Sequence, residues 1–203
     1  YLPVQTRANG QVYQWNEPVN GTRQGSYEPI TKLITPQSKQ IYSLGTQQNL
    51  GEKMHFGGEV SFSSNDQNSF SKLDSKDDYG MGINLQLDRK DVLKVDTTLS
   101  LSSFISYRRS GKQFDPLENY RSIEFERDWN LNDGILSETE NLVKAGFLLN
   151  GKDSLNATYN FEYLKYTQNY AATRHNTTGL LNKNGYSLNW SGSLLNSSDS
   201  FRD

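Results

Sequence analysis

The sequence predicts an all-β protein, built as an antiparallel up-and-down meander of long strands. Apolar side chains recur at every second position over most of the chain after residue 38. This is the period of a β-strand that has one apolar face. Short links join several of these segments, and neighbouring strands joined by short links pair antiparallel. We find no helical periodicity of useful length.

The first 37 residues differ from the rest of the chain. They hold four of the five prolines, at Pro3, Pro18, Pro29 and Pro36. Proline cannot donate to a strand ladder, so we expect this segment to be mostly extended and irregular, with one short strand near Gln11–Asn16. The chain therefore divides into an irregular, proline-containing segment (1–37) and a strand meander (38–203).

Within the meander, alternation places each strand in turn. A first strand is expected at Gln40–Thr46, and the next two have their apolar faces at Met54–Phe62 and Tyr79–Leu87. After a tight link at Asp88–Val92, a single strand is predicted from Leu93 to Tyr107. The later strands are expected at Val143–Leu149, Leu155–Tyr163 and Tyr186–Leu194.

Such strands suit two architectures, a segment of an outer-membrane β-barrel or a soluble β-sandwich or jelly roll. The faces opposite the apolar ones carry small polar groups such as Gly82, Asn84 and Ser191. These groups fit the watery inner face of a barrel better than the charged outer face of a soluble sheet. The sequence therefore favours the barrel, with the sandwich as the alternative. In the barrel, the lipid-facing residues of the longest strand are Leu93, Val95, Leu99, Leu101, Ile105 and Tyr107.

The link lengths also suit a barrel, in which short turns alternate with long loops. Short links are expected at Gln47–Lys53, Asp88–Val92 and Asn150–Asp153, and long ones at Ser64–Asp78 and Asn169–Asn184. The alternation holds only if Arg108–Asn141 is one excursion between two strands. The β-like piece Ser122–Asn130 then belongs to a loop hairpin or folds inward.

Composition excludes several classes of protein. The chain has 21 basic and 23 acidic residues, a net charge of −2, so no basic field favours nucleic acid. The absence of cysteine rules out disulfides and thiolate metal sites. No run approaches the length of a membrane helix. We see no signal peptide, so we expect a cytosolic chain, a mature chain or an internal slice of a longer one.

The sharpest catalytic candidate is the acidic run of Glu124, Glu126 and Asp128. On a strand, spacing of two puts all three carboxylates on one face, about 6.5–7 Å apart. Glycosidases need two carboxylates flanking a sugar bond. The order differs from the usual jelly-roll glucanase motif, and the alternative is a wet strand face balanced by Arg121. We expect no enzyme activity and keep the glycoside hydrolase as the less favoured alternative.

Other candidate sites are weaker. Asp74, Asp77 and Asp78 lie in a polar loop and offer the hard oxygen ligands of calcium, but the spacing matches no EF-hand. His55 and His175 are far apart in sequence and neither has a ligand-type carboxylate pattern, so a zinc site is not expected. We expect no cofactor.

Three segments together resemble a known group of proteins: Tyr27–Pro36, Asn68–Gly80 and Phe114–Leu131. They are similar to segments of large, poorly characterised β-barrel outer-membrane proteins of Bacteroidetes. The resemblance implies an outer-membrane location and a longer parent chain, and it carries over no catalytic residues. One departure is the end of the chain, Phe201-Arg202-Asp203, because complete barrels commonly end on an aromatic residue.

The expected function is therefore structural or transport-related, with apolar side chains facing lipid and polar side chains lining a lumen. The expected partners are outer-membrane lipid and, through the long loops, other envelope proteins or polysaccharide. The alternative is a secreted or cell-surface sandwich that binds carbohydrate.

Overall fold

The computed structural model describes residues 2–5, 11–27, 35–71, 73, 75–94, 99–118, 121–131, 138–151, 155–167 and 170–199. The chain divides into two compact units, Tyr1–Thr35 and Pro36–Asp203. The sequence places this boundary after residue 37. The first unit holds a small antiparallel sheet of β1 (Leu2–Val4) and β2 (Val12–Gln14).

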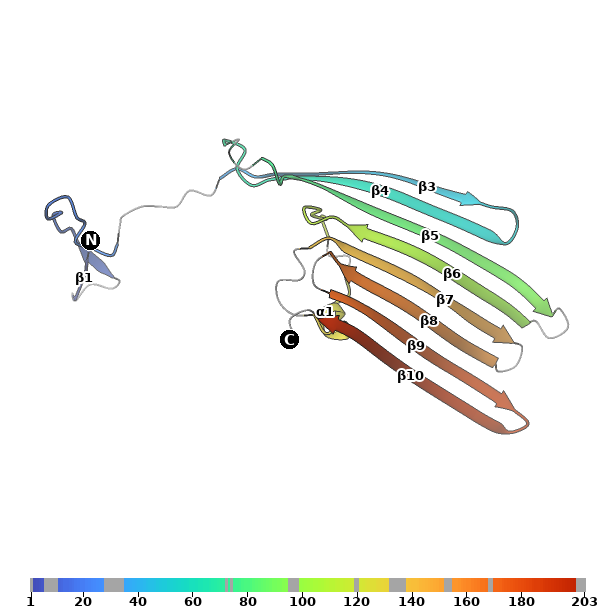
Figure 1. The fold of residues 1–203 in the computed structure, drawn as a ribbon. Coiled ribbons are helices and arrows are strands. Elements are labelled where there is room, and N and C mark those ends of the chain that lie inside the picture. The colour runs from blue at the N-terminus through green and yellow to red at the C-terminus, as the bar shows by residue number, and fades with distance from the viewer. Residues whose placement is uncertain are drawn as a thin grey trace. The chain divides into compact units, whose positions relative to one another are not determined.

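The second unit is an eight-stranded antiparallel meander in which every strand pairs with its neighbours in the chain (Figure 1). This confirms the predicted all-β meander. The sheet is not closed, and its edges are β3 and β10. The strands are β3 (Ser38–Asn49), β4 (Met54–Asp66), β5 (Tyr79–Lys94), β6 (Leu99–Ser110), β7 (Glu140–Gly151), β8 (Leu155–Tyr166), β9 (Tyr170–Lys183) and β10 (Tyr186–Asp199).

The pairing register brings the apolar positions of all these strands onto one face of the sheet. Val60 pairs with Ile83, Leu85 with Tyr107, and Ala145 with Phe161. We call this the apolar face and the opposite one the polar face. Many large side chains of the apolar face are exposed, among them Tyr42, Leu44, Phe62, Tyr79, Ile105, Phe147, Tyr186, Leu188 and Leu194.

Charged side chains on the apolar face occur only toward the strand ends. At one end of the sheet they are Asp66, Arg109 and Lys165, and at the other Arg89, Asp91 and Lys183. Between them, each strand has a stretch of about 9–13 residues whose positions on this face carry no Asp, Glu, Lys or Arg.

The predicted single strand from Leu93 to Tyr107 is wrong. Leu93 lies near the end of β5, beside a β-bulge at Val92/Lys94, and β6 begins at Leu99 and runs back antiparallel to β5. The predicted link Asp88–Val92 is part of β5. Val95, a predicted lipid-facing residue, lies outside the described residues. The other predicted lipid-facing residues, Leu99, Leu101, Ile105 and Tyr107, are on the apolar face of β6.

The predicted long link Asn169–Asn184 is also wrong, because Tyr170–Lys183 forms β9. This strand pairs with β8 on one side and β10 on the other along nearly its whole length. Its apolar-face positions include Thr173, His175 and Thr177, so the alternation that reveals the other strands is absent here. Backbone hydrogen bonds to both neighbouring strands stabilise β9, although its side-chain pattern does not predict a strand.

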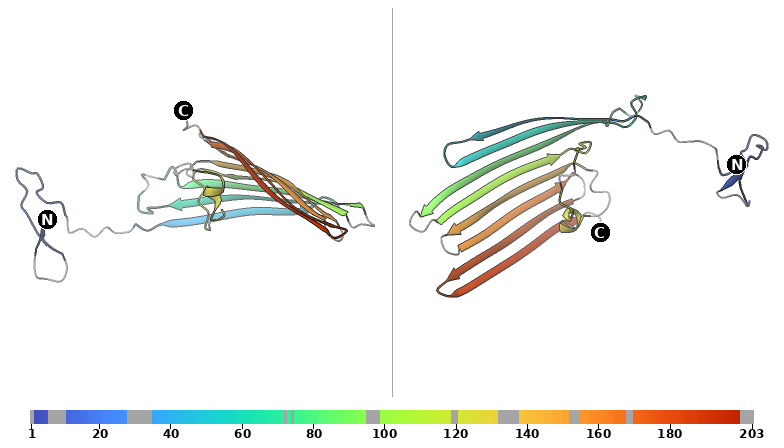
Figure 2. Two further views of the ribbon diagram at one scale, coloured as in Figure 1. Left: turned by 90° about the horizontal axis from the view of Figure 1, so that it is seen from below. Right: turned by 180° about the vertical axis from the view of Figure 1, so that it is seen from behind.

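Residues 111–139 form one excursion between β6 and β7, as the predicted alternation of links requires. The predicted β-like piece Ser122–Asn130 contains instead a short helix, α1 (Phe125–Asp128). α1 lies against one face of the sheet (Figure 2). The described part of the chain holds no helix with the length and apolar character of a membrane span.

Candidate functional site

The described residues of the excursion, 111–118 and 121–131, lie against the polar face near one end of the sheet, and we call them the inner segment. Its first part is held over β3–β5. Asp115 pairs with Lys39 at 2.8 Å and accepts a hydrogen bond from Asn65 at 2.7 Å. The Phe114 ring packs on Gly82, where an added Cβ would lie 2.9 Å from it. Gly80 is equally occluded by the backbone of residues 113 and 114.

These contacts explain the two glycines of β5, Gly80 and Gly82. On a strand, glycine often marks a place where another backbone approaches closely. Gly80 and Gly82 give the inner segment room to lie directly on β5.

The second part of the inner segment is held by a small hydrophobic cluster. Phe125 and Trp129 are buried against side chains from the polar face of β7, β8 and β9. The Tyr170 hydroxyl donates a hydrogen bond to the Trp129 carbonyl oxygen. The residues that the sheet contributes to the cluster are Leu142, Leu164, Tyr166, Tyr170 and Ala172. The buried hydrophobic core of the described chain therefore lies on its polar face.

Glu140 is the centre of the first ion-pair network on this face. Its side chain is fully buried, and Arg108 donates to one carboxylate oxygen at 3.0 Å. Arg121 of the inner segment donates to the other oxygen at 2.7 and 3.1 Å, and the Tyr166 hydroxyl does so at 2.9 Å. A buried carboxylate needs such compensation for its lost hydration. Glu140 therefore links the inner segment to the sheet.

Glu162 forms a second network two rows further along the sheet, beyond the Leu142–Leu164 pair. Its carboxylate, 7 % exposed, pairs with Arg174 at 2.5 and 2.6 Å and with Lys144 at 2.9 Å. Arg174 also reaches Asp128 of α1 at 3.4 Å and lies over the Trp129 ring, 4.8 Å from its centroid. Glu140 and Glu162 are buried, and their basic partners keep part of their surface in contact with solvent.

The predicted carboxylate triad does not form. Glu124, Glu126 and Asp128 lie at the start of α1 and within it, so the strand spacing behind the glycosidase alternative is wrong. Glu124 pairs with Arg127 at 3.0 Å and Asp128 pairs with Arg174. Asp128 therefore links α1 to β9, whereas the Glu124–Arg127 pair lies within the inner segment.

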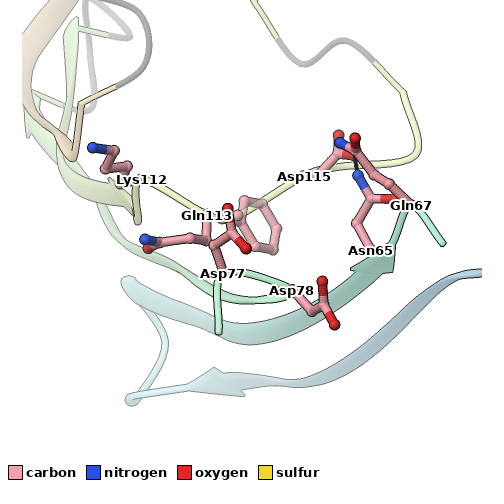
Figure 3. Close-up of a pocket in the computed structure, with 8 residues that line it drawn as sticks. Asn65, Gln67, Asp77, Asp78, Lys112, Gln113 and Asp115 are labelled. Atoms are coloured by element: carbon pink, nitrogen blue, oxygen red, sulfur yellow. Dashed lines mark hydrogen bonds between the residues drawn. The ribbon is translucent and has the colours of Figure 1, made fainter. Parts of the chain in front are cut away.

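A separate hollow of about 460 Å³ lies at the same end of the sheet (Figure 3). Asp77 and Asp78 line it together with Lys112 and Asp115. Asp74, the third predicted calcium ligand, lies outside the described residues. Among the residues that the structure describes, no group of three His, Cys, Asp or Glu side chains could hold a metal ion.

The two histidines are far apart. His55 is exposed at the start of β4 and bonds Asn49 through Nδ1 at 2.6 Å. His175 lies on the apolar face of β9, where its Nδ1 and the Tyr159 hydroxyl are 2.8 Å apart.

The sequence analysis missed the two networks as a site. Glu162 occupies a polar position between the apolar Phe161 and Tyr163, which was the available signal. Its partner Arg174 was expected in a loop, so no pattern joined the two residues. No protein-family model, curated protein or solved structure matches the chain.

Proposed function

We propose that residues 38–203 form part of the wall of an outer-membrane β-barrel, with the apolar face against lipid and the polar face along a water-filled lumen. In this proposal the inner segment narrows the lumen, and the function is structural or transport-related. The observation that supports it most directly is that burial is inverted between the two faces of the sheet. Many large side chains of its apolar face are exposed, whereas its buried core and its buried carboxylates, Glu140 and Glu162, lie on the polar face.

This inversion favours the barrel over the sandwich. In a sandwich, the apolar face is the core and the polar face meets water. Large contiguous apolar surfaces are rare on soluble monomers and mark contact with lipid or protein. The charge-free apolar length of each strand matches the thickness of a bilayer.

The edges of the sheet support the same proposal. β3 carries one charged residue, Lys39, β10 carries one, Asp199, and neither contains proline. Exposed edge strands in soluble proteins are usually protected by charges, proline or bulges. Long edges without such protection are typical of strands that pair with further strands, as the strands of a closed wall do.

The connections give a third line of support. At one end of the sheet the strands are joined by residues 50–53, 95–98, 152–154 and 184–185. At the other end they are joined by residues 67–78, 111–139 and 167–169. Short turns at one end and long loops at the other are typical of outer-membrane barrels. The connection at 167–169 is the one short link at the long-loop end.

The test uses the absence of native cysteine. Ile105→Cys and Ser106→Cys place one thiol on each face of β6, at neighbouring positions. Each is labelled with an environment-sensitive fluorophore in the intact protein, reconstituted in lipid vesicles. We expect brominated acyl chains to quench the label at 105 and aqueous iodide to quench the label at 106. Iodide quenching at both positions, with no effect of the brominated lipid, would contradict the proposal.

A further inference from the structure

The polar face holds a second candidate site, which borders the Glu140 network at Arg108. A groove of about 530 Å³ lies between the polar face of β3–β6 and residues 114–118 of the inner segment. A neighbouring hollow of about 380 Å³ shares Glu59 and Asn84 with this groove. The two together form one trough along β3–β5, which we call the β3–β5 trough. Its size is that of a small-molecule binding site.

The floor of the trough is largely bare. Gly45 and Gly57 line it, and a Cβ added at Gly57 would meet nothing within 4 Å. Phe114 stands at one end, with its ring packed on Gly82. The trough is thus an open channel, with an aromatic ring at one end and empty space along the strands.

The walls carry hydroxyl and amide groups. Ser43 and Ser61 bond one another at 2.7 Å, and Ser61 donates to Glu59 at 2.8 Å. Glu118 of the inner segment is a second acidic residue of the trough. Amides come from Asn84 of β5, and from Gln47 and Gln86 in the neighbouring hollow. These groups offer donors and acceptors in close alternation without a strong net charge.

This chemistry selects among ligand classes. Two acidic and two basic residues line the trough, Glu59, Glu118, Arg108 and Arg109, so their formal charges balance. Arg108 is in addition paired with Glu140. An anion or a cation therefore meets no net charge of the opposite sign, and an apolar ligand would leave the amides without hydrogen-bond partners. A neutral sugar suits every group present, because its hydroxyls pair with amides and its C–H face stacks on an aromatic ring. We propose that the β3–β5 trough binds a neutral oligosaccharide.

The proposal rests on the proposed function in one respect, which is that water and solutes reach the polar face. It names the class of solute that this face recognises. Phe114 provides the stacking platform, and Asn84 with Glu59 provides the hydrogen bonds to sugar hydroxyls.

The test measures binding by the intact protein in lipid nanodiscs, by calorimetry, with maltohexaose, cellohexaose and xylohexaose as probes. We expect saturable binding of at least one probe and roughly tenfold weaker binding by Phe114→Ala. Because Phe114→Ala can also loosen the inner segment, Gly57→Leu is the second variant. A Cβ at this position meets no atom within 4 Å, so the leucine side chain extends into the trough and should abolish binding. The matched control is Asn189→Ala, an exposed polar-face residue of β10 outside the trough, which should bind as the parent does.

Two results would overturn the inference. One is no binding of any probe, and the other is equal binding by the parent and Gly57→Leu. The labels at positions 105 and 106 separate these results from failure of the proposed function. If aqueous iodide quenches the label at 106 and no probe binds, the result supports a water-filled lumen and contradicts the sugar site. If aqueous iodide does not quench the label at 106, the result contradicts the proposed function as well.

Discussion

The Glu140→Gln substitution tests whether the ion pairs fasten the inner segment to the wall. Glutamine keeps the shape of the side chain and its hydrogen bond with Tyr166, but it removes the charge that Arg108 and Arg121 share. Breaking a buried pair by removing one partner costs about 3–5 kcal/mol. Arg108 and Arg121 are 28 % and 20 % exposed, so solvent screens part of the loss. We therefore expect a loss of about 3 kcal/mol, at the lower end of that range.

The matched control is Glu124→Gln in the inner segment. Glu124 is 54 % exposed and pairs with an Arg127 that is 73 % exposed, so its loss should cost about 0–1 kcal/mol. The assay is urea unfolding of the intact protein in detergent, followed by Trp129 fluorescence with the other two tryptophans replaced by phenylalanine. Trp129 is 1 % exposed, so its emission reports release of the inner segment. Equal stability of the Glu140 and Glu124 variants would refute the reasoning.

Three further predictions concern packing and the two faces of the sheet. Phe125→Ala should destabilise the inner segment by about 3–5 kcal/mol in the same urea assay, because it removes a buried ring that packs against Trp129 in the cluster. Ile105→Arg should lower the free energy of unfolding in vesicles by about 2–4 kcal/mol, while Ser106→Arg on the other face should change it far less. Gly179→Val should cost about 1–3 kcal/mol, because the Trp190 ring covers Gly179, and adding Trp190→Ala should recover part of that loss. Equal effects of the two arginines, or no recovery in the double variant, would contradict these assignments.

The β5–β6 pair shows that a regular alternation of apolar side chains can continue across a reversal of the chain direction. Leu85 pairs with Tyr107 and Leu87 with Ile105, so odd positions face odd positions across this hairpin. The alternation therefore continues in phase from one strand, through the connection, into the next. Periodicity reports which face a residue occupies, and it carries no information about the direction of the chain.

β9 shows the opposite failure. Its apolar-face residues are small or polar between Ala171 and Gly179, so periodicity gave no signal. The strand exists because β8 and β10 each satisfy one side of its backbone. Local pattern could not show this, since both partners are separate segments of the chain.

The sequence by itself determined the all-β class, most of the strands and the residues that share each strand face. It did so because a strand alternates its side chains whatever its neighbours are. Only the tertiary structure decided that all these faces join into one apolar surface, since that depends on the register of each pair. Tertiary structure also turned Phe125 and Trp129 toward the polar face and brought Glu140 together with Arg108 and Arg121. Those contacts join residues far apart in the chain, and burial of their charges has meaning only once the sheet and the inner segment are packed together.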